Sequence, residues 1–427
     1  MLDINLVREN PKLIEKNLRN KFQEGKIPIL HQLIKDDNEW RKLKLKADNK
    51  RSERNKISLD ISKAKKEGKN IKPILKKAKE IPKELEKIET KLKKVKNKAS
   101  KALLQMPNIM HSTVPKGKDD SKNKVIKIIG KPKKLKFKIK NHVELAEKLG
   151  LADFEASAKT SGNGFYFLKG DLALLNQALI RYTIEFMQKK KYTYIEPPLM
   201  LGKEVLSTAL DTQEFEQTIY EIQDEELSLI GTSEHSLLAM YLDHEIHENK
   251  LPIKYYSYSM CFRKEIGSHG INEKGLWRTH QFNKVEQFIF CKPEESYKLY
   301  DELQKNTIEL FKSLKLPIRI LEICSGDLPD WKSKSSDIEI YRPTTKDYGE
   351  VTSLSNCTDY QARKANIKLV RKDGNREVLH TLNNTAIATS RVMVAIIENY
   401  QNKDGSVTIP TVLEPYMFGK KKLLSLI

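Results

Sequence analysis

The feature that most constrains the fold is an apolar seam between residues 71 and 99. Apolar side chains recur there in steps of three and four residues for about four heptads, a spacing typical of a coiled-coil helix. The seam consists of Ile71, Ile74, Ala78, Ile81, Leu85, Ile88, Leu92, Val95 and Ala99. Because proline removes a helical hydrogen bond, we expect Pro82 to interrupt this helix.

A second, weaker seam precedes the first and is broken by polar residues at Asp36, Lys50 and Arg54. Its apolar members are Leu33, Trp40, Leu43, Ala47, Ile57, Ile61 and Ala64. A turn at 68–70 separates the two seams, so the pair is predicted to fold back as an antiparallel helical hairpin. Such a hairpin could serve self-association instead of binding, with its charged outer positions merely solvated.

Charge is unevenly distributed along the chain. The first 140 residues carry 42 basic and 17 acidic side chains, a net charge of +25, whereas the whole chain carries +21, which leaves −4 for the remainder. A general lysine surplus would be spread evenly. The segregation therefore favours a polyanionic partner at the N-terminal end.

Length and composition set further bounds. A chain of 427 residues suits a large domain with an appendage. Its four cysteines form no CxxC pair, so we expect neither a disulfide framework nor a structural zinc. The longest apolar run, at 392–397, is too short for a membrane span, and no secretory signal is legible. The chain is expected to be soluble and cytoplasmic, with no membrane partner.

The organisation predicted from these patterns has three parts. Residues 1–108 form an N-terminal domain with the helical hairpin, and 109–140, rich in lysine and proline, form a connector. Residues 141–427 form a domain in which strands alternate with long helices, including a helix at 171–191 that leads into a strand with two prolines.

Within this last part, two β-rich segments bracket a glycine- and charge-rich turn at 267–275: MCFRKE before it and THQFNKVEQFIF after it. They predict a long antiparallel hairpin. Alternation along the second strand places Phe282, Lys284 and Glu286 on one face, which offers an aromatic plane and a carboxylate to a ligand. An amphipathic hairpin with paired surface charges would show a similar pattern.

This hairpin resembles the second signature motif of class II aminoacyl-tRNA synthetases, and within that class the chain is most similar to the seryl-tRNA synthetases of the ordinary, non-zinc type. The similarity rests on GLWRTHQFNKVEQF, on TSE at 232–234, on SNCTDYQARKANI at 355–367 and on HTLNNTAIATSRVMVAIIENYQ from 380. It runs from MLDINLVRENP to VTIPTVLEPYM, nearly the whole chain.

The resemblance implies an α+β fold, with an antiparallel catalytic sheet flanked by helices and an N-terminal coiled-coil arm. It implies a homodimeric ligase that converts L-serine and ATP to seryl-adenylate and transfers the seryl group to the 3′ end of serine tRNA. The helical arm would bind the long variable arm of that tRNA through backbone and shape. Whether selenocysteine tRNA is charged as well is left open.

For ATP, the resemblance assigns Arg263 to the α-phosphate and Arg278 and Arg391 to the γ-phosphate end. Phe282 would stack on adenine, with Arg391 on the other face of the nucleotide. Glu350 and Ser353 would bind Mg²⁺ between the phosphates, since hard oxygen ligands suit that ion. The catalytic residues are then Arg263, Glu350 and Arg391, and the remaining ATP-binding positions are Lys264, Glu265, Thr279, Val351 and Thr352. Each charge could also be an ordinary surface ion pair.

For serine, the resemblance assigns the amino group to the 232–234 segment and the side chain to a small polar pocket. The residues are Thr232, Ser233, Glu234, Glu286, Asn383 and Thr385. A site that hydrogen-bonds a substrate hydroxyl rejects alanine and excludes the larger threonine by volume. Thr232 also has the sequence context of a helix N-cap, and both roles are compatible.

Two segments are set aside as carrying no chemistry. HEIH at 244–247 is one residue short of the HExxH spacing and is interpreted as an exposed helix face, and KSKSS at 332–336 as a solvated loop. In the hairpin turn, Ile271 and Lys274 stand where arginine is common in the family, which puts the contacts of that loop with tRNA in doubt.

Two rival functions remain. Another ligase of the same class, a threonyl or a carrier-protein enzyme, is disfavoured by the basic arm and by the absence of a Cys/His grouping. A non-catalytic paralogue that uses only the arm to bind RNA is disfavoured because Arg263, Glu286, Glu350 and Arg391 are all present.

Overall fold

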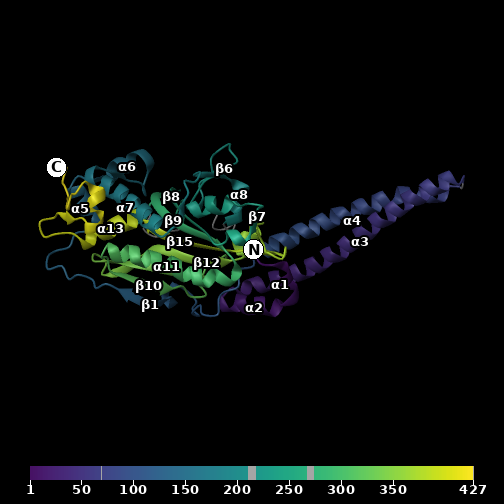
Figure 1. The fold of residues 1–427 in the computed structure, drawn as a ribbon, viewed down its shortest axis with the longest axis horizontal. Helices are drawn as coiled ribbons and strands as arrows, with labels where there is room; N and C mark the ends of the chain where they lie inside the picture. The colour runs from purple at the N-terminus through teal and green to yellow at the C-terminus, as the bar shows by residue number, and fades with distance from the viewer. Residues whose placement is uncertain (69, 210–217, 267–273, 427) are drawn as a thin grey trace. The chain divides into compact units, whose positions relative to one another are not determined.

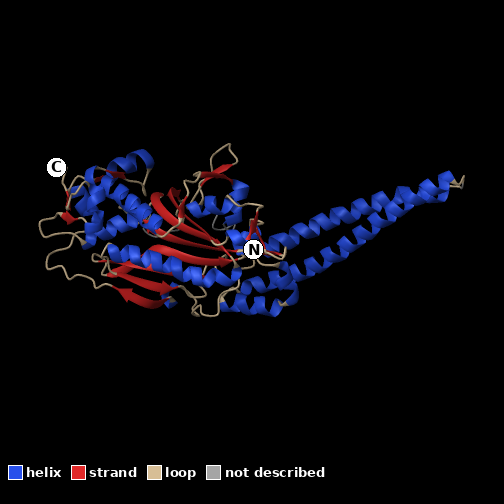
Figure 2. Ribbon diagram, in the orientation of Figure 1, coloured by secondary structure: helices blue, strands red, loops and turns tan. Residues whose placement is uncertain are grey.

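The computed structural model describes residues 1–68, 70–209, 218–266 and 274–426. The chain divides into two compact units, Met1–Pro107 and Asn108–Ile427 (Figure 1). The first unit is built from helices, and the second is organised around a large sheet (Figure 2).

The helical unit begins with two short helices whose starts are capped by side chains. Asp3 accepts a hydrogen bond from the Asn5 amide, and Asn10 accepts one from the Leu13 amide. The elements are α1 (Ile4–Glu9), α2 (Pro11–Asn20), the 3₁₀ turn η1 (Glu24–Lys26), α3 (Ile27–Lys66) and α4 (Lys72–Leu104). Fully buried apolar side chains from α2 and the start of α3 form its core: Ile14, Leu18, Leu30 and Leu33.

The predicted helical hairpin is confirmed, since α3 and α4 pack along each other with both apolar seams buried or half-buried. Ion pairs of 2.7 Å between Glu39 and Lys91 and of 2.8 Å between Lys50 and Glu84 join the helices in antiparallel register. The expected interruption at Pro82 was wrong, because α4 is continuous through it. Pro82 is exposed, so water can reach the carbonyl that loses its partner.

The second unit contains an eight-stranded sheet of order β1-β10-β11-β12-β15-β9-β8-β4. Every neighbouring pair is antiparallel except β4 and β8. The strands are β1 (Lys124–Ile129), β4 (Thr193–Tyr194), β8 (Ile253–Phe262), β9 (Gln281–Cys291), β10 (Ile318–Glu322), β11 (Lys334–Arg342), β12 (Asp347–Thr358) and β15 (His380–Ala388). The prediction of an antiparallel sheet is confirmed.

Figure 1 shows α11 running across one face of this sheet. The helices of the unit are α5 (His142–Lys148), α6 (Phe154–Ser161), α7 (Gly170–Lys189), α8 (Lys203–Ala209), α10 (Ser233–Ala239), α11 (Ser296–Ser313), α12 (Tyr360–Lys364) and α13 (Thr389–Asn399). Side chains of α7, α11 and α13 share one apolar core with β9 and β15, whereas α8, α10 and α12 belong to a second core.

Short strands and 3₁₀ turns complete the unit. They are β2 (Ala152–Asp153), β3 (Phe167–Leu168), β5 (Met200–Gly202), β6 (Leu227–Leu229), β7 (Glu245–His247), β13 (Lys368–Val370), β14 (Arg376–Val378), β16 (Val407–Thr408), β17 (Lys422–Leu423), η2 (Asp120–Lys122), η3 (Glu248–Lys250), η4 (Pro293–Glu295) and η5 (Thr411–Met417).

Three segments differ from the sequence-based expectations. The segment expected to be a connector with little regular structure contains β1, the edge strand of the large sheet; five of its six residues are exposed, so it lacks the alternation that marks a strand. The HEIH segment is not a helix face, because β7 pairs in parallel with β13 and buries Ile246. The KSKSS segment is not a solvated loop, since it runs into β11 and is largely buried.

Among the described residues, no helix combines the length and the apolar character that a membrane span requires.

Candidate active site

A cavity of about 1250 Å³, including its open mouth, lies on the sheet face that α11 does not cover. Along β9, Gln287 turns to α11, where its amide nitrogen donates to Thr307 at 3.0 Å, while the neighbouring Glu286 lines the cavity. The predicted residues that line it are Thr232, Glu234, Arg263, Glu265, Arg278, Thr279, Phe282, Glu286, Glu350, Val351, Thr352, Ser353, Asn383, Thr385 and Arg391. Ser233 and Lys264 do not line it.

The predicted β-hairpin is formed by β8 and β9 and supplies the floor of the cavity. Phe282, Lys284 and Glu286 all face the cavity, as their alternation predicts. The Lys284 ammonium lies 2.6 Å from a carboxylate oxygen of Glu286, which also accepts the Thr385 hydroxyl at 3.2 Å. Glu286 is almost fully buried, so this pair holds its carboxylate in a fixed orientation.

Glu234, which is half-buried, supplies a second carboxylate to the cavity. It lies in the first turn of α10, and the Thr232 hydroxyl caps that helix by accepting a hydrogen bond from the Glu234 amide at 3.2 Å. One carboxylate oxygen accepts the side-chain amides of Gln361 at 2.7 Å and Asn383 at 2.8 Å. Burial, followed by the nearby charge of Glu286, raises the pKa of Glu234. A cationic ligand group would relieve both effects.

Two arginines that flank the turn of the hairpin, Arg263 and Arg278, line the cavity. The Arg263 guanidinium lies 5.3 Å from the centre of the Phe282 ring, and its Nε donates to the Gly231 carbonyl at 3.1 Å. Arg278 is paired with Glu265 at 3.0 Å. The bond that anchors Arg263 uses Nε and not the terminal nitrogens, so these can meet an anionic ligand.

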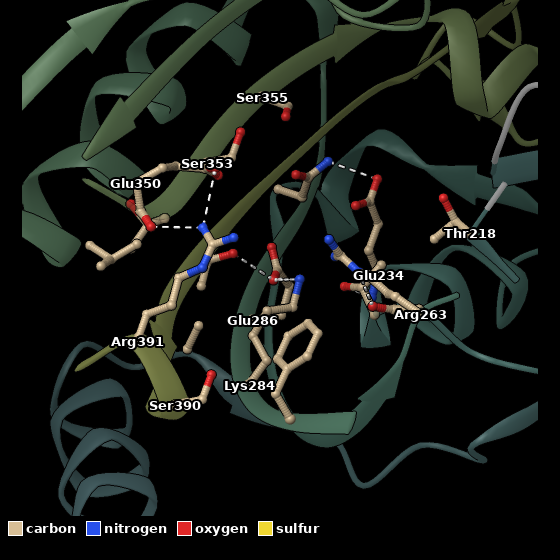
Figure 3. Close-up of a pocket in the computed structure, with 18 of the residues that line it drawn as sticks. Thr218, Glu234, Arg263, Lys284, Glu286, Glu350, Ser353, Ser355, Ser390 and Arg391 are labelled. Atoms are coloured by element: carbon tan, nitrogen blue, oxygen red, sulfur yellow. Dashed lines mark hydrogen bonds and ion pairs between the residues drawn. The ribbon is translucent and has the colours of Figure 1, made fainter. Parts of the chain in front are cut away.

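Arg391 comes from the first turn of α13 and is held on the opposite side of the cavity (Figure 3). One of its terminal nitrogens donates to the Glu350 carbonyl at 2.7 Å and lies 3.3 Å from the Glu350 carboxylate, and its Nε donates to the Trp277 carbonyl at 3.2 Å. The Trp277 ring is 5.5 Å from Arg391 and 4.3 Å from Arg342. Sequence reasoning missed Trp277, since a single tryptophan in the irregular segment before β9 carries no distinctive pattern.

Glu350 and Ser353 share the cavity although they are three residues apart on one strand. A β-bulge makes this possible: Glu339 of β11 faces Glu350 while the preceding residue faces Thr352, which leaves an extra residue between them. Asp337 lies opposite Ser353 in the same pairing, and its Oδ1 has no hydrogen-bond partner among the described residues. Burial, and then the charge of Glu350, raises the pKa of Asp337 to about 7.

This donor set fits a magnesium ion. Carboxylate and hydroxyl oxygens are the hard ligands that Mg²⁺ prefers, and the unpartnered oxygen of Asp337 adds negative potential behind them. No group of three or more His, Cys, Asp or Glu side chains in the described ranges is placed to hold a metal. Phosphate oxygens and water would therefore have to complete the coordination shell.

Further lining residues were not predicted from the sequence. They are Ala209, Thr218, Gly231, His235, Trp277, Pro329, Trp331, Lys332, Ser355, Ala388 and Ser390. Of the two positions in the hairpin turn that depart from arginine, Ile271 lies outside the described residues, and Lys274 forms an ion pair of 2.5 Å with Glu147 of α5.

Comparison with known proteins places both units. Residues 1–110 match the family of the seryl-tRNA synthetase N-terminal domain, and residues 215–400 match the tRNA synthetase class II core domain (G, H, P, S and T). A serine–tRNA ligase of Methanoregula boonei is 43% identical over 98% of this chain and 99% of that protein.

Solved structures agree with these matches. The crystal structure of seryl-tRNA synthetase from Pyrococcus horikoshii complexed with ATP superposes with a TM-score of 0.94 at 40% identity, covering 100% of both chains. The cytoplasmic serine–tRNA ligase from Naegleria fowleri in complex with AMP gives a TM-score of 0.88 at 34% identity, covering 100% of this chain and 99% of the other.

Proposed function

The chain belongs to the seryl-tRNA synthetase family, and from this premise we propose that the cavity joins L-serine to ATP, yielding seryl-adenylate and pyrophosphate. The seryl group then passes to the 3′ end of serine tRNA. One observation carries the assignment: the carboxylates of Glu234 and Glu286 and three arginines line a single cavity on one face of the sheet. That arrangement suits a small zwitterion beside a polyphosphate.

The serine half of the site is built around Glu234 and Glu286. Glu234 and the Thr232 hydroxyl receive the ammonium group of serine, because a cation offsets the desolvation that raises the pKa of this carboxyl. Glu286, with Asn383 and Thr385, surrounds the serine hydroxyl. Alanine would leave these polar groups unpaired, and the methyl group of threonine would meet them sterically.

The nucleotide half uses fixed cations and no covalent nucleophile. Arg263 holds the α-phosphate, on which charge develops as pyrophosphate leaves, and Arg278 and Arg391 hold the far phosphates. Phe282 stacks on adenine. The position of Arg391 at the N-terminal end of α13 adds the helix dipole to its guanidinium. Arg278 is held in place by an ion pair with Glu265, and Arg391 by an ion pair with Glu350.

Glu350 and Ser353 would hold Mg²⁺ when the nucleotide is bound. The ion would supply neutralising charge between the phosphates. The protein positions the two ligands through the bulge in β12, and Arg391 fixes the orientation of the Glu350 carboxylate.

The parts outside the cavity fit a tRNA-binding enzyme. We assign residues 1–108 to tRNA binding, with the α3–α4 hairpin on the long variable arm, and 141–427 to catalysis, with 109–140 joining them. The excess of basic over acidic residues in the first 140 residues supports this division. We further assign a homodimer, for which β4, an edge strand of the large sheet, is available, and the cytoplasm as the place of action.

Pyrophosphate exchange with each of the twenty amino acids tests the activity directly. We expect exchange with ATP to depend on L-serine, and charging to occur on serine tRNA but not on a tRNA with a short variable arm. Exchange that is faster with threonine or glycine than with serine would contradict the assignment. Mass photometry of the same preparation tests the homodimer.

A further inference from the structure

Lys332 is a buried cation of the cavity to which the chemistry above gives no role. Only 9% of the residue is exposed, and its ammonium donates to the Ser353 hydroxyl at 3.0 Å and to the Ser335 hydroxyl at 3.3 Å. Both partners are neutral. In the described part of the chain, no carboxylate lies within ion-pairing distance of its ammonium.

Other lysines nearby differ in this respect. Lys284, also in the cavity, is paired with Glu286 at 2.6 Å, and Lys334, two residues further along, is paired with Glu322 at 2.9 Å. Burial of an ammonium without a counter-ion costs free energy that the fold must offset elsewhere. An unpaired charge that lines an open cavity indicates that a ligand supplies the opposite charge.

The surroundings place this cation where the two halves of the site meet. Ser353, which accepts from Lys332, belongs to the nucleotide half, and the Ser353 hydroxyl and the Glu350 carboxylate lie on the same side of the cavity (Figure 3). On the serine side, the positive charge of Lys332 lowers the pKa of Glu234, against the larger opposing effect of burial. An anionic group that is bound between the halves would lie within reach of the ammonium.

We propose that Lys332 is a substrate-binding residue whose ammonium pairs with an anionic oxygen of a bound substrate. The inference rests on the proposed function and deepens it. Two groups have the required chemistry, the carboxylate of serine and the phosphates of ATP, and both must lie between Glu234 and Ser353 for the adenylate to form. Arg263 then does not neutralise the reacting anions alone.

Binding measurements on the full-length protein test the proposal and identify the anion. Lys332→Met keeps the length of the side chain and removes its charge. If the partner is the serine carboxylate, the affinity for L-serine falls by about ten-fold or more while the affinity for serinamide, which lacks the carboxylate, is unchanged. If the partner is a phosphate, the affinity for ATP with Mg²⁺ falls by that factor and the affinity for adenosine is unchanged. Lys332→Arg should retain more affinity than Lys332→Met in either case.

Thermal unfolding of the free protein separates this role from a structural one. Because the unpaired charge is a cost to the fold, Lys332→Met should unfold at the same or a higher temperature than the wild type. Lys334→Met is the matched control. It loses the ion pair with Glu322, so it should unfold at a lower temperature than the wild type and yet bind both substrates with wild-type affinity.

Two results would overturn the proposal. One is a Lys332→Met protein that binds L-serine and ATP within about two-fold of the wild type. The other is a Lys332→Met protein that is strongly destabilised or does not fold, since the cation would then serve the fold. A wild-type protein without serine-dependent exchange would instead refute the proposed function.

Discussion

At the scale of single residues, the cavity depends on charges that are buried and paired. Glu286 is the clearest case, because its carboxylate is bonded to Lys284 and Thr385 and is withdrawn from water. Glu286→Gln keeps the size and loses the charge. We expect kcat/KM for serine to fall by roughly ten- to a hundred-fold, the range for a hydrogen bond to a charged group, with little change in ATP binding.

This substitution also leaves the Lys284 ammonium without its counter-ion, which destabilises the fold on its own. The double variant Glu286→Gln, Lys284→Met removes both charges and serves as the control for folding. Pyrophosphate exchange at varied serine gives both constants. Unchanged kcat and KM for serine in Glu286→Gln would remove this carboxylate from the serine pocket.

Glu234 makes stability depend on pH in a defined direction. Its folded-state pKa is raised above the ordinary value of 4.5, first by burial and then by Glu286. The folded protein therefore keeps a proton that the unfolded chain releases. The stabilising contribution of the protonated carboxyl is complete below pH 4.5 and is lost as the pH rises through the folded-state pKa.

Glu234→Gln has no such titration, and its amide oxygen can still accept from Gln361 and Asn383. We expect its free energy of unfolding, relative to the wild type, to rise as the pH increases from 4.5 toward neutrality in the ligand-free protein. Urea unfolding at a series of pH values measures the difference. A difference that is constant with pH would mean that Glu234 titrates normally in the fold.

Arg391 tests the phosphate clamp. Its planar group bonds two backbone carbonyls, those of Glu350 and Trp277, in directions that an ammonium cannot reproduce. Arg391→Lys should lose about 2–4 kcal/mol of transition-state stabilisation in serine activation, with serine binding in the absence of ATP nearly unaffected. Arg376→Lys, an exposed arginine paired with Glu245, is the control. Activation at the wild-type rate by Arg391→Lys would make the residue structural.

At the scale of elements, periodic segments could be predicted from the sequence and irregular ones could not. The apolar seams of α3 and α4 and the alternation of β9 repeat often enough for the sequence to indicate which face of each element packs against a partner. The KSKSS segment was predicted to be a solvated loop because lysines are usually exposed. In the structure, Lys332 donates to the Ser353 hydroxyl of β12, and Lys334 forms an ion pair with Glu322 of β10, so both partners come from other elements. The bulge between Glu350 and Ser353 and the stacking of Arg342 and Arg391 on Trp277 likewise depend on neighbouring segments, so no local sequence pattern predicts them.

The hairpin of α3 and α4 can be shortened without disturbing its base. Residues 52–88 lie beyond the ion pair of Arg51 with Glu89 and carry 12 basic and 6 acidic side chains. Joining Arg51 to Glu89 through a short glycine-rich turn keeps the buried base residues, among them Leu33 and Val95. We expect tRNA charging to fall by at least roughly ten-fold, while serine-dependent pyrophosphate exchange is retained.

Circular dichroism and thermal unfolding of the shortened protein verify that both units still fold. Equal loss of exchange and charging in a folded protein would mean that the hairpin supports the cavity and is not a separate tRNA arm. A preserved charging rate would move tRNA binding to other basic residues of the chain.

At the scale of the whole molecule, the uneven distribution of charge matches the proposed division between tRNA binding and catalysis. The first 140 residues hold a net +25 and the remaining residues hold −4. The cavity nevertheless has its own small excess of cations, since Arg263, Arg278, Lys284, Lys332 and Arg391 line it against Glu234, Glu265, Glu286 and Glu350. ATP would therefore be held by a few fixed, partly buried charges, whereas tRNA would be held by many exposed ones.

These two kinds of binding respond differently to salt, because exposed phosphate contacts release counter-ions and buried pairs are screened much less. We expect the logarithm of kcat/KM for tRNA charging to fall steeply and linearly with the logarithm of the KCl concentration, and that of serine-dependent exchange to change little. The protein shortened at 52–88 should show a shallower slope for charging, since it has fewer phosphate contacts. Parallel slopes for charging and exchange, or an unchanged slope after shortening, would mean that the basic hairpin makes no phosphate contacts and that its lysines are only solvated.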